Sequence, residues 1–571
     1  MKYSADIQKI KRTFIPEGFI ISNWQNVEPF FKSLLSRKIN SESEFLNWLS
    51  DLSELEAVVN EDACLRQIKS SCDTENKELE EAYNFYCTDI QPQMQPYVNE
   101  INKKFLNSPF LGSLDKNLYG TLIRNTRKNI DLFNEKNIAV QSEISVLQQE
   151  FGRITGRLTV NIDGEELTLQ QAGKFLLSSD REKRKEAYFK INECRLSVKN
   201  ELNILFNKLL QLRNEEAKNA GFENYVSYRY KELGRFDYSE NESYKFHDAI
   251  KQYVVPLLSK IYLRKKKKLG IDQLRPWDLD ADTGEPLRPF GEAAELLEKT
   301  ICCVNHLDTF FGDCLTRMQQ DNKLDLASRK GKAPGGFNCP LPESGVPFIF
   351  MNATGQPDDV TTLIHEAGHA VHSFLAHHLK LTSFKEYPME IAEVASMSME
   401  LMTMDYWNTF YKNESDLKKA KTKHLEEIIL LLPWIAAVDK FQHWIYLNSG
   451  HTDEQRDEAW LSILKEFSSE EIDYTGLEEY RKNQWRKQLH IFEVPFYYIE
   501  YGIAQLGAIG IWKQYKENPE SALSNYCNAL KLGGTKTLPE LYKTAGLEFD
   551  FSPQKVKTLI EFVSSELDKM L

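Results

Sequence analysis

A segment near the middle of the chain carries two histidines and a glutamate at the spacing of a catalytic metal site. Residues 359–374 contain the pattern His365-Glu366-x-x-His369. On a helix, residues four apart lie on one face, so both imidazoles can bind the same ion. Glu366 follows His365 by about 100° around the helix axis, where its carboxylate can hold a water molecule beside the metal. The pattern therefore predicts a hydrolytic metal centre on a helix.

The histidine pair needs a third protein ligand, because a catalytic zinc ion has three such ligands and keeps one position open. In the metzincin pattern Gly would stand at position 372 and a third His at 375. These positions are His372 and Leu375, so that class is excluded. We therefore expect the third ligand on a second helix at residues 391–400. Two glutamates one helical turn apart compete for the role, Glu390 and Glu393.

A second group of residues suited to this chemistry lies near the C-terminus. His490 precedes a run in which Tyr497, Tyr498 and Tyr501 fall within five residues. Tyr498 and Tyr501 are one helical turn apart, so they face the same way. Phenol hydroxyls can donate hydrogen bonds to the oxyanion of a tetrahedral intermediate. Taken alone, however, the cluster is more typical of an aromatic core with satisfied hydroxyl groups.

These segments together resemble oligoendopeptidase F and the wider thimet oligopeptidase family of zinc peptidases. The resemblance rests on residues 365–372, which read His-Glu-Ala-Gly-His-Ala-Val-His, on Ala-Glu-Val-Ala-Ser at 392–396, and on the C-terminal His…Tyr-x-x-Tyr signature. Clear resemblance covers about residues 265–571. It implies one Zn²⁺ ion per chain, held by His365, His369 and Glu393.

The resemblance also implies a role for each remaining site residue. Zn²⁺ would polarise the scissile carbonyl and its bound water, and Glu366 would take the water proton and pass it to the leaving amine. Glu400 matches an acidic position that orients a ligating histidine, whereas His372 is interpreted as a packing or supporting residue. Hydrogen bonds to the oxyanion or to the substrate backbone would come from Tyr501, Tyr498 and His490. The family spacing from the histidine to the tyrosines is one residue longer than here. Tyr497 is therefore the alternative to Tyr498 as a hydrogen-bond donor.

The expected activity is hydrolysis of internal bonds in short peptides, in a cleft that by family resemblance excludes folded proteins. A zinc carboxypeptidase or dipeptidyl carboxypeptidase would share the zinc ligands, but it needs a cation for the substrate's terminal carboxylate, and the sequence does not locate one. An aminopeptidase is disfavoured because no Gly-x-Met-Glu-Asn element is present. A non-catalytic peptide-binding protein with structural zinc is a more remote alternative, since structural sites are closed by four ligands.

Composition narrows the partners and the compartment. The chain has 571 residues, of which 42% are hydrophobic and 12% aromatic, enough for a large core. Its net charge of −13 argues against nucleic acid as a partner. Nine cysteines without metal spacing indicate reduced thiols. The N-terminus lacks the apolar region of a signal peptide, and the longest apolar run, residues 428–438, is too short to cross a membrane. We expect a cytoplasmic protein of undetermined oligomeric state that acts on short peptides.

The elements that must position these residues are mostly helical. The predicted fold is a mostly α, two-lobed zincin-type peptidase with a deep central cleft and a small β-sheet beside the zinc helix. Residues 1–190 are expected to form an N-terminal helical lobe, with a β-hairpin near 157–169 that turns at an Asp-Gly pair. Residues 191–571 are expected to form the catalytic lobe with the zinc site and the C-terminal helices.

Two segments just before the metal helix complete the prediction. Residues 332–342 are rich in glycine and proline and predict a loop, and the apolar residues that follow at 346–352 predict a short strand. An edge strand beside a metal site can bind an extended peptide through main-chain hydrogen bonds. An ordinary buried strand is the alternative, and the family resemblance favours the substrate-lining role.

Overall fold

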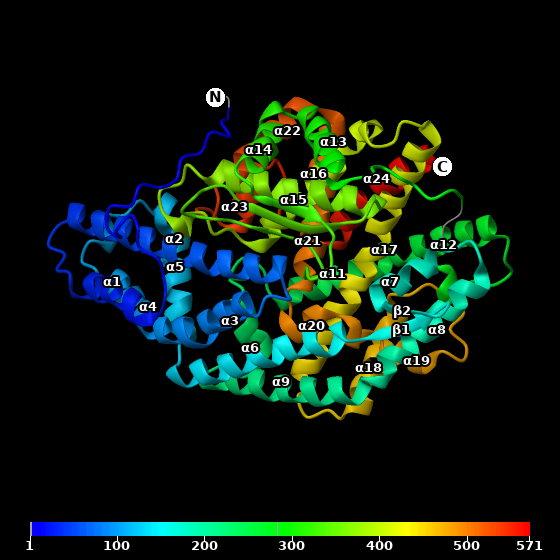
Figure 1. The fold of residues 1–571 in the computed structure, drawn as a ribbon, viewed down its shortest axis with the longest axis horizontal. Coiled ribbons are helices and arrows are strands. Elements are labelled where there is room, and N and C mark those ends of the chain that lie inside the picture. Colours follow the sequence, from blue (N-terminus) through cyan, green and yellow to red (C-terminus); the bar gives the residue numbers. More distant parts are fainter. Residues whose placement is uncertain (1–2, 282–283) are drawn as a thin grey trace. The chain divides into compact units, whose positions relative to one another are not determined.

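The structure is a computed structural model that describes residues 3–281 and 284–571. It is mostly helical with a small sheet, as predicted (Figure 1). The chain folds into two compact units, each assembled from three separate segments. Unit 1 contains Met1–Glu135, Leu287–Lys421 and Ile503–Phe549, and unit 2 contains Lys136–Pro286, Thr422–Gly502 and Asp550–Leu571. The predicted boundary between residues 190 and 191 falls inside helix α8 (Arg181–Ser197), which lies wholly in unit 2.

Unit 1 holds the N-terminal helices, the three-stranded sheet and the predicted metal helix. Its helices are α1 (Trp24–Ser36), α2 (Glu42–Cys72), α3 (Lys77–Phe85), α4 (Gln91–Leu106), α5 (Lys116–Leu132), α13 (Ala293–Asn305), α14 (Thr309–Gln320), α15 (Pro357–Ala376), α16 (Met389–Thr403), α22 (Pro519–Leu530) and α23 (Leu538–Thr544). Its strands are β3 (Leu324–Ala327), β4 (Phe337–Cys339) and β5 (Phe348–Ala353).

The described residues of unit 2 form helices, one hairpin and an isolated β-bridge between Leu274 and Ile472, joined by loops. Besides α8, its helices are α7 (Leu169–Gly173), α9 (Lys199–Asn219), α10 (Tyr225–Glu232), α11 (Glu240–Tyr253), α12 (Val255–Leu269), α18 (Asp453–Glu466), α19 (Glu478–Lys482), α20 (Leu489–Glu493) and α24 (Pro553–Met570). Three of the five boundaries between the units fall within helices, namely α6 (Glu135–Gly156), α17 (Glu414–Leu447) and α21 (Tyr498–Glu517).

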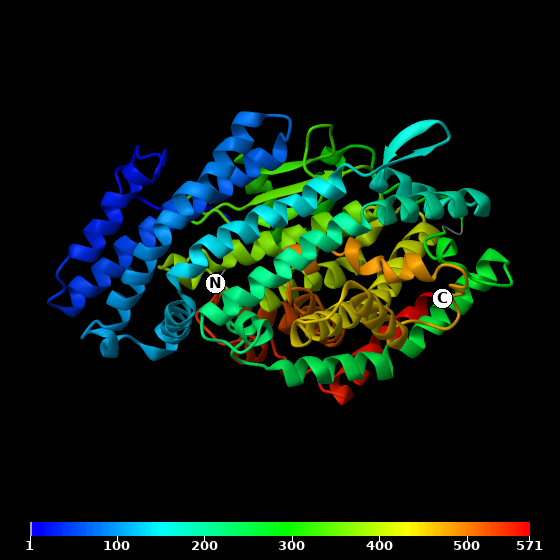
Figure 2. The same ribbon diagram turned by 90° about the horizontal axis from the view of Figure 1, so that it is seen from below.

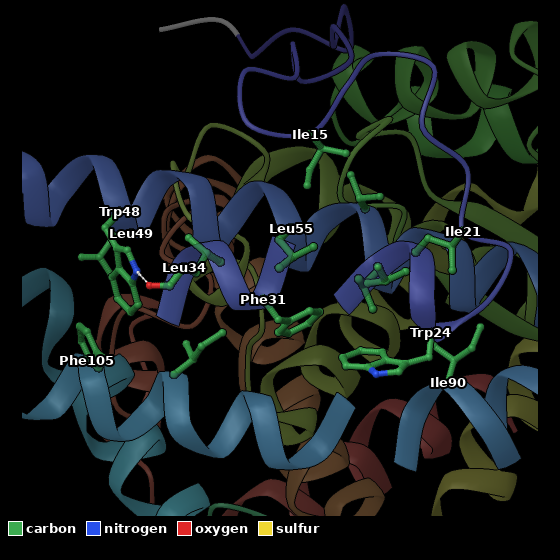
Figure 3. Packing of buried hydrophobic residues seen from close by; sticks show 14 of the residues in the cluster. Ile15, Ile21, Trp24, Phe31, Leu34, Trp48, Leu49, Leu55, Ile90 and Phe105 are labelled. Carbon is green, nitrogen blue, oxygen red and sulfur yellow. Dashed lines mark hydrogen bonds between the residues drawn. The ribbon is translucent and has the colours of Figure 1, made fainter. Parts of the chain in front are cut away.

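The N-terminal part of unit 1 has its own hydrophobic core (Figure 3). The buried residues of α1 recur every three or four positions, which gives the helix one apolar face: Trp24, Val27, Phe31 and Leu34. That face packs with buried residues of α2 and α4. The indole nitrogen of Trp48 donates a hydrogen bond of 3.0 Å to the carbonyl of Leu34, which satisfies a polar atom inside the core.

The sheet of unit 1 has the strand order β3-β5-β4 and contacts the metal helix α15. The central strand β5 pairs in parallel with β3 and antiparallel with β4. The prediction of a strand before the metal helix is therefore confirmed. Within the segment predicted to be a loop, however, residues 337–339 form strand β4. The central position of β5 also means that the edge strand beside α15 is β4, which sequence reasoning took for loop.

Unit 2 contains the predicted hairpin, formed by β1 (Thr159–Ile162) and β2 (Glu165–Thr168), which pair antiparallel. It is the cyan pair of arrows at the upper right of Figure 2. Asp163 and Gly164 form its two-residue turn with φ angles of 54° and 86°. Two positive φ angles in succession are what a type I′ turn requires, and an Asp-Gly pair adopts them readily.

One long helix, α17, is apolar enough to resemble a membrane span. It contains an 18-residue window that meets the length and composition of such a span, but 72% of that window is buried inside the protein. The helix is therefore packed as a core helix would be.

Candidate active site

The metal helix α15 begins with local signals that its sequence supplies. Pro357 occupies the first helical position, where the missing N–H has no partner to lose. The carboxylate of Asp359 accepts hydrogen bonds from the backbone nitrogens of Thr354 (2.7 Å) and Gln356 (2.9 Å). These contacts fix the point at which the helix leaves the loop after β5.

Helix α16 lies directly against α15, and a glycine makes this approach possible. A Cβ atom on Gly368 would lie 2.5 Å from the Cα of Ser396 and 2.8 Å from the carbonyl oxygen of Ala395. Any side chain at this position would therefore collide with the backbone of α16. Gly368 thus brings the residues of the two helices within reach of one another.

The two helices bring three of the predicted ligands together. The candidate ligand atoms of His365, His369 and Glu393 all lie within 4.8 Å of one another. Glu393 Oε2 is 3.3 Å from His365 Nε2 and 3.7 Å from His369 Nε2. Glu390 is buried on the same helix but is not a member of this group. The geometry therefore favours Glu393 over Glu390 as the third ligand.

Neighbouring side chains orient two of the ligand groups. Glu400 Oε1 lies 2.6 Å from His365 Nδ1, which leaves Nε2 of the same ring directed at the ligand group. The hydroxyl of Ser396 donates to Glu393 Oε2 at 3.2 Å. Burial alone would raise the pKa of Glu393, but the neighbouring imidazoles of His369 and His365 and the hydroxyl of Ser396 outweigh it and lower the pKa to about 2. The third ligand is therefore held as a carboxylate.

Glu366 is the buried acid beside this group. Its side chain is largely covered, and its Oε2 has no hydrogen-bond partner among the described residues. Burial raises the pKa of this carboxyl to about 7. A buried oxygen without a partner is costly unless something else binds there. Two imidazole nitrogens, a carboxylate oxygen and this adjacent acceptor form a donor set that fits a metal ion with a water molecule.

His372 lies on the same helix but outside the ligand group. Its ring stacks on Tyr387, with 3.5 Å between the centroids and 13° between the planes. The side chain is buried, and burial lowers its pKa well below the usual value. These contacts agree with the predicted packing role.

The predicted histidine and tyrosines form a cluster of rings in unit 2. The His490 centroid is 4.6 Å from that of Tyr498 and 5.8 Å from that of Tyr501, and the two tyrosine rings are 5.5 Å apart. Tyr497, the alternative to Tyr498, lies 6.1 Å from His490 and 5.3 Å from Tyr501. The structure thus brings all four rings together, with Tyr498 nearest to His490.

Comparison with known proteins identifies the family of the chain. A model described as peptidase family M3 matches residues 175–559, and one described as the peptidase M3 N-terminal domain matches residues 18–133. The chain belongs to peptidase family M3. This confirms the resemblance that the motifs predicted.

Solved structures support the family assignment over nearly the whole length of this M3 chain. PZ peptidase A, solved with an inhibitor, is 27% identical with a TM-score of 0.91, and the match covers 98% of this chain and 99% of the other. A structure described as a putative oligoendopeptidase F is 28% identical with a TM-score of 0.90 and the same coverage. A putative oligoendopeptidase F from Bacillus anthracis is 25% identical with a TM-score of 0.86, covering 97% of each chain.

Curated relatives of this M3 chain are more distant in sequence. An oligoendopeptidase F homolog of Borreliella burgdorferi is 25% identical over 70% of the chain, and oligopeptidase PepF of Bacillus subtilis is 22% identical over 72%. The matches cover 66% and 60% of those relatives, so the chain spans less than two thirds of their lengths.

Sequence reasoning missed three arginines of this M3 chain that hydrogen-bond to the backbone of residues 491–496, the end of α20 and the turn before α21 and its tyrosines. Arg213 donates to the carbonyls of Ile491 (3.1 Å) and Phe492, and Arg229 to the carbonyl of Pro495 (3.1 Å). Arg235 donates to the carbonyl of Phe496 and, at 2.9 Å, to Glu500 Oε1. No local pattern could have revealed these contacts, because more than 250 residues separate each arginine from the turn.

The turn needs this support because part of it is strained. Phe496 has a φ angle of 65°, a left-handed conformation that costs a bulky residue roughly 1–2 kcal/mol. Its ring is fully buried against Tyr230, His443 and Tyr446. Its backbone nitrogen donates to Gln442 at 2.7 Å. Packing and hydrogen bonds together therefore fix the point from which α21 and its tyrosines start.

Proposed function

We propose that the protein is a zinc-dependent endopeptidase that hydrolyses internal bonds of short peptides. The observation that carries the proposal is the convergence of His365, His369 and Glu393 beside Glu366, whose Oε2 is buried without a partner among the described residues. Membership of peptidase family M3 supports the same reaction class. We further propose that the enzyme is soluble and cytoplasmic, where its nine cysteines, all free in the structure, would stay reduced.

Three residues would hold the metal. Two neutral imidazoles and one carboxylate form a ligand set that Zn²⁺ uses in hydrolytic sites, with a fourth position left for water or substrate. When bound by His365, His369 and Glu393, the ion would act as a Lewis acid toward a water molecule and the scissile carbonyl. The contact from Glu400 to His365 Nδ1 keeps Nε2 available for this role.

Glu366 would move the proton. Its buried carboxylate oxygen would first accept a proton from the attacking water and would then donate the same proton to the leaving amine. A buried carboxyl is suited to both steps. Burial raises its pKa to about 7, so near neutral pH the charged and the neutral forms differ little in free energy.

The ring cluster of unit 2 would supply hydrogen-bond donors. We assign His490, Tyr498 and Tyr501 as donors to the oxyanion or to the substrate backbone, from their match to the family signature and their mutual contacts. Burial raises the pKa of Tyr498 to about 12, so its hydroxyl keeps the proton that it would donate.

Strand β4 would bind the extended peptide. Both edges of β5 are already paired, whereas β4 pairs with β5 alone among the described strands. The side chain of Asn338 on β4 reaches the carbonyl of Glu366 at 3.5 Å, so the strand lies beside the base. A peptide added to the outer edge of β4 would pass close to that residue.

The test is mass spectrometry of a peptide mixture after incubation with the enzyme, with chelator, and with Zn²⁺ restored. Internal cuts that vanish with chelator and return with Zn²⁺ are expected. Trimming from C-termini alone would support the carboxypeptidase or dipeptidyl carboxypeptidase alternative. If the zinc-loaded protein makes no cut, the result would support the alternative of a non-catalytic peptide-binding protein.

A further inference from the structure

Three side chains of unit 2 form a hydrogen-bonded chain that ends on the predicted histidine. The indole nitrogen of Trp434, on α17, donates to Gln488 Oε1 at 3.0 Å. The amide nitrogen of Gln488 lies 2.7 Å from His490 Nδ1. Gln488 immediately precedes α20, the short helix that carries His490. One amide group thus joins a tryptophan of the core helix to the histidine of the ring cluster.

Trp434 decides which way this amide points. An indole N–H can only donate a hydrogen bond, so the atom that faces it must be the amide oxygen. The flipped amide would set two N–H groups against each other. The Gln488 nitrogen, which can only donate, must therefore face His490. The orientation follows from the chemistry of the two side chains.

The amide in turn decides where His490 carries its proton. A nitrogen that receives a hydrogen bond must offer a lone pair, so Nδ1 of His490 is unprotonated. A neutral imidazole has one proton, and here it resides on Nε2. An imidazolium ring would place an N–H group against the amide N–H group at 2.7 Å.

We propose that Gln488, oriented by Trp434, is a positioning residue that holds His490 as the neutral tautomer protonated on Nε2. In the proposed peptidase, on which this inference rests, His490 then donates a hydrogen bond from Nε2 to a substrate oxygen and does not act as a charged acid. Gln488 and Trp434 also oppose the rise that burial causes in the pKa of Tyr498, so the same amide and indole lie close to its hydroxyl.

The tautomer can be measured directly by ¹⁵N NMR of the full chain labelled at histidine. The His490 signals are identified by their loss in His490→Gln. We expect an unprotonated Nδ1 and a protonated Nε2 at neutral pH. A protonated Nδ1, alone or in an imidazolium ring, would overturn the proposal. This readout does not depend on turnover, so an inactive protein would contradict the proposed function and leave the tautomer testable.

Gln488→Glu tests whether the tautomer matters for rate. The carboxylate keeps the shape of the side chain but accepts a hydrogen bond, so it should draw a proton onto Nδ1 of His490. We expect kcat to fall roughly 10²-fold, the effect of losing one oxyanion donor, with KM nearly unchanged. The matched control is Gln484→Glu, which adds the same charge in the turn before Gln488 and should keep wild-type kcat. An unchanged kcat in Gln488→Glu with Nδ1 protonated would overturn the positioning role.

Trp434→Phe is the second variant, and it serves also if Gln488→Glu fails to fold. It removes the indole donor and keeps an aromatic ring on α17. The amide is then free to flip, so we expect both His490 tautomers in the spectrum and a smaller fall in kcat than in Gln488→Glu. A single Nε2-protonated tautomer in Trp434→Phe would show that the indole does not orient Gln488.

Discussion

At the scale of single residues, the candidate metal site contains two kinds of group: three side chains that would bind the ion, and one that would move a proton. The candidate ligand atoms of His365, His369 and Glu393 cluster within 4.8 Å, and Glu366 lies next to them with an unpartnered oxygen. Substitutions can therefore affect metal binding and proton transfer separately.

Glu366→Gln should retain the metal and lose activity. The amide has nearly the same volume, so the three ligands stay in place, but it cannot accept the water proton. We expect kcat to fall about 10²- to 10⁴-fold. Metal content and kcat measured on the same sample check this, with Glu390→Gln as the control for a buried glutamate outside the ligand group. Activity within about tenfold of wild type, well short of the loss of a general base, would remove Glu366 from that role.

Glu393→Ala and Glu390→Ala distinguish the two candidates for the third ligand. Both glutamates are buried on α16, but only Glu393 has an oxygen within 4 Å of both histidine nitrogens. Glu393→Ala should lower zinc occupancy sharply after dialysis, while Glu390→Ala should keep it. Zinc measured by elemental analysis decides the matter, and the opposite result would move the ligand one turn along the helix.

At the scale of elements, the site depends on how closely α15 and α16 approach. The Gly368 position faces the α16 backbone, which cannot rotate away as a side chain would. Gly368→Ala should therefore destabilise unit 1 by roughly 1–3 kcal/mol and weaken zinc binding. Denaturant unfolding and zinc titration measure both effects.

Gly152→Ala is the matched control, because this glycine lies inside α6 with nothing within 4 Å of the added Cβ. It should raise stability by about 0.5–1 kcal/mol, since alanine favours helices. Equal effects of the two substitutions would mean that close helix approach is not what Gly368 provides.

A second element-level contact predicts how stability depends on pH. His247 on α11 donates toward Asp439 on α17, with 2.8 Å between Nε2 and Oδ2, and both are buried. Burial lowers the pKa of His247, although Asp439 counteracts it. The unfolded chain therefore binds a proton at this histidine more readily than the folded chain. Stability from this group is present above the unfolded pKa of about 6.5 and is lost as pH falls below it.

Urea unfolding at pH 7.5 and pH 5.5 tests this dependence. Wild type should lose stability between the two values, and His247→Gln should lose less, because its amide does not titrate. The neighbouring groups that act on His247, including His443 and Lys440, are present in both proteins, so the difference between the two proteins reports on His247. An equal loss in both proteins would assign the pH dependence to other groups.

At the scale of the whole molecule, the candidate ligands all belong to unit 1, on α15 and α16. A ligand that binds only the folded state stabilises it by RT ln(1 + [L]/Kd). Zinc should therefore slow hydrogen exchange in residues 357–376 and 389–403 and have a smaller effect on α9 and α18 of unit 2. Exchange mass spectrometry with and without chelator provides the measurement. Uniform protection of both units would show that they unfold together.

The sequence alone determined those features that depend on neighbouring residues. The four-residue spacing of His365 and His369 places both on one helix face by the geometry of the backbone. The Asp163-Gly164 pair specifies a hairpin turn, because those residues tolerate positive φ. The mostly helical fold and the family likewise followed from patterns within short windows.

Only the tertiary structure decided features that depend on distant segments. Glu390 and Glu393 share a helix face in sequence, and in the structure, where α16 packs on Gly368, Glu393 is the one of the two that joins the candidate ligand group. The arginines that hold the turn before the tyrosines lie more than 250 residues from it in sequence. The Gln488 amide lies only two residues from His490, but their contact depends on the rotamers of both side chains. The division into two units, each built from three separate segments, could not be predicted for the same reason. Which distant segments bury one another's apolar side chains cannot be read from a short stretch of sequence.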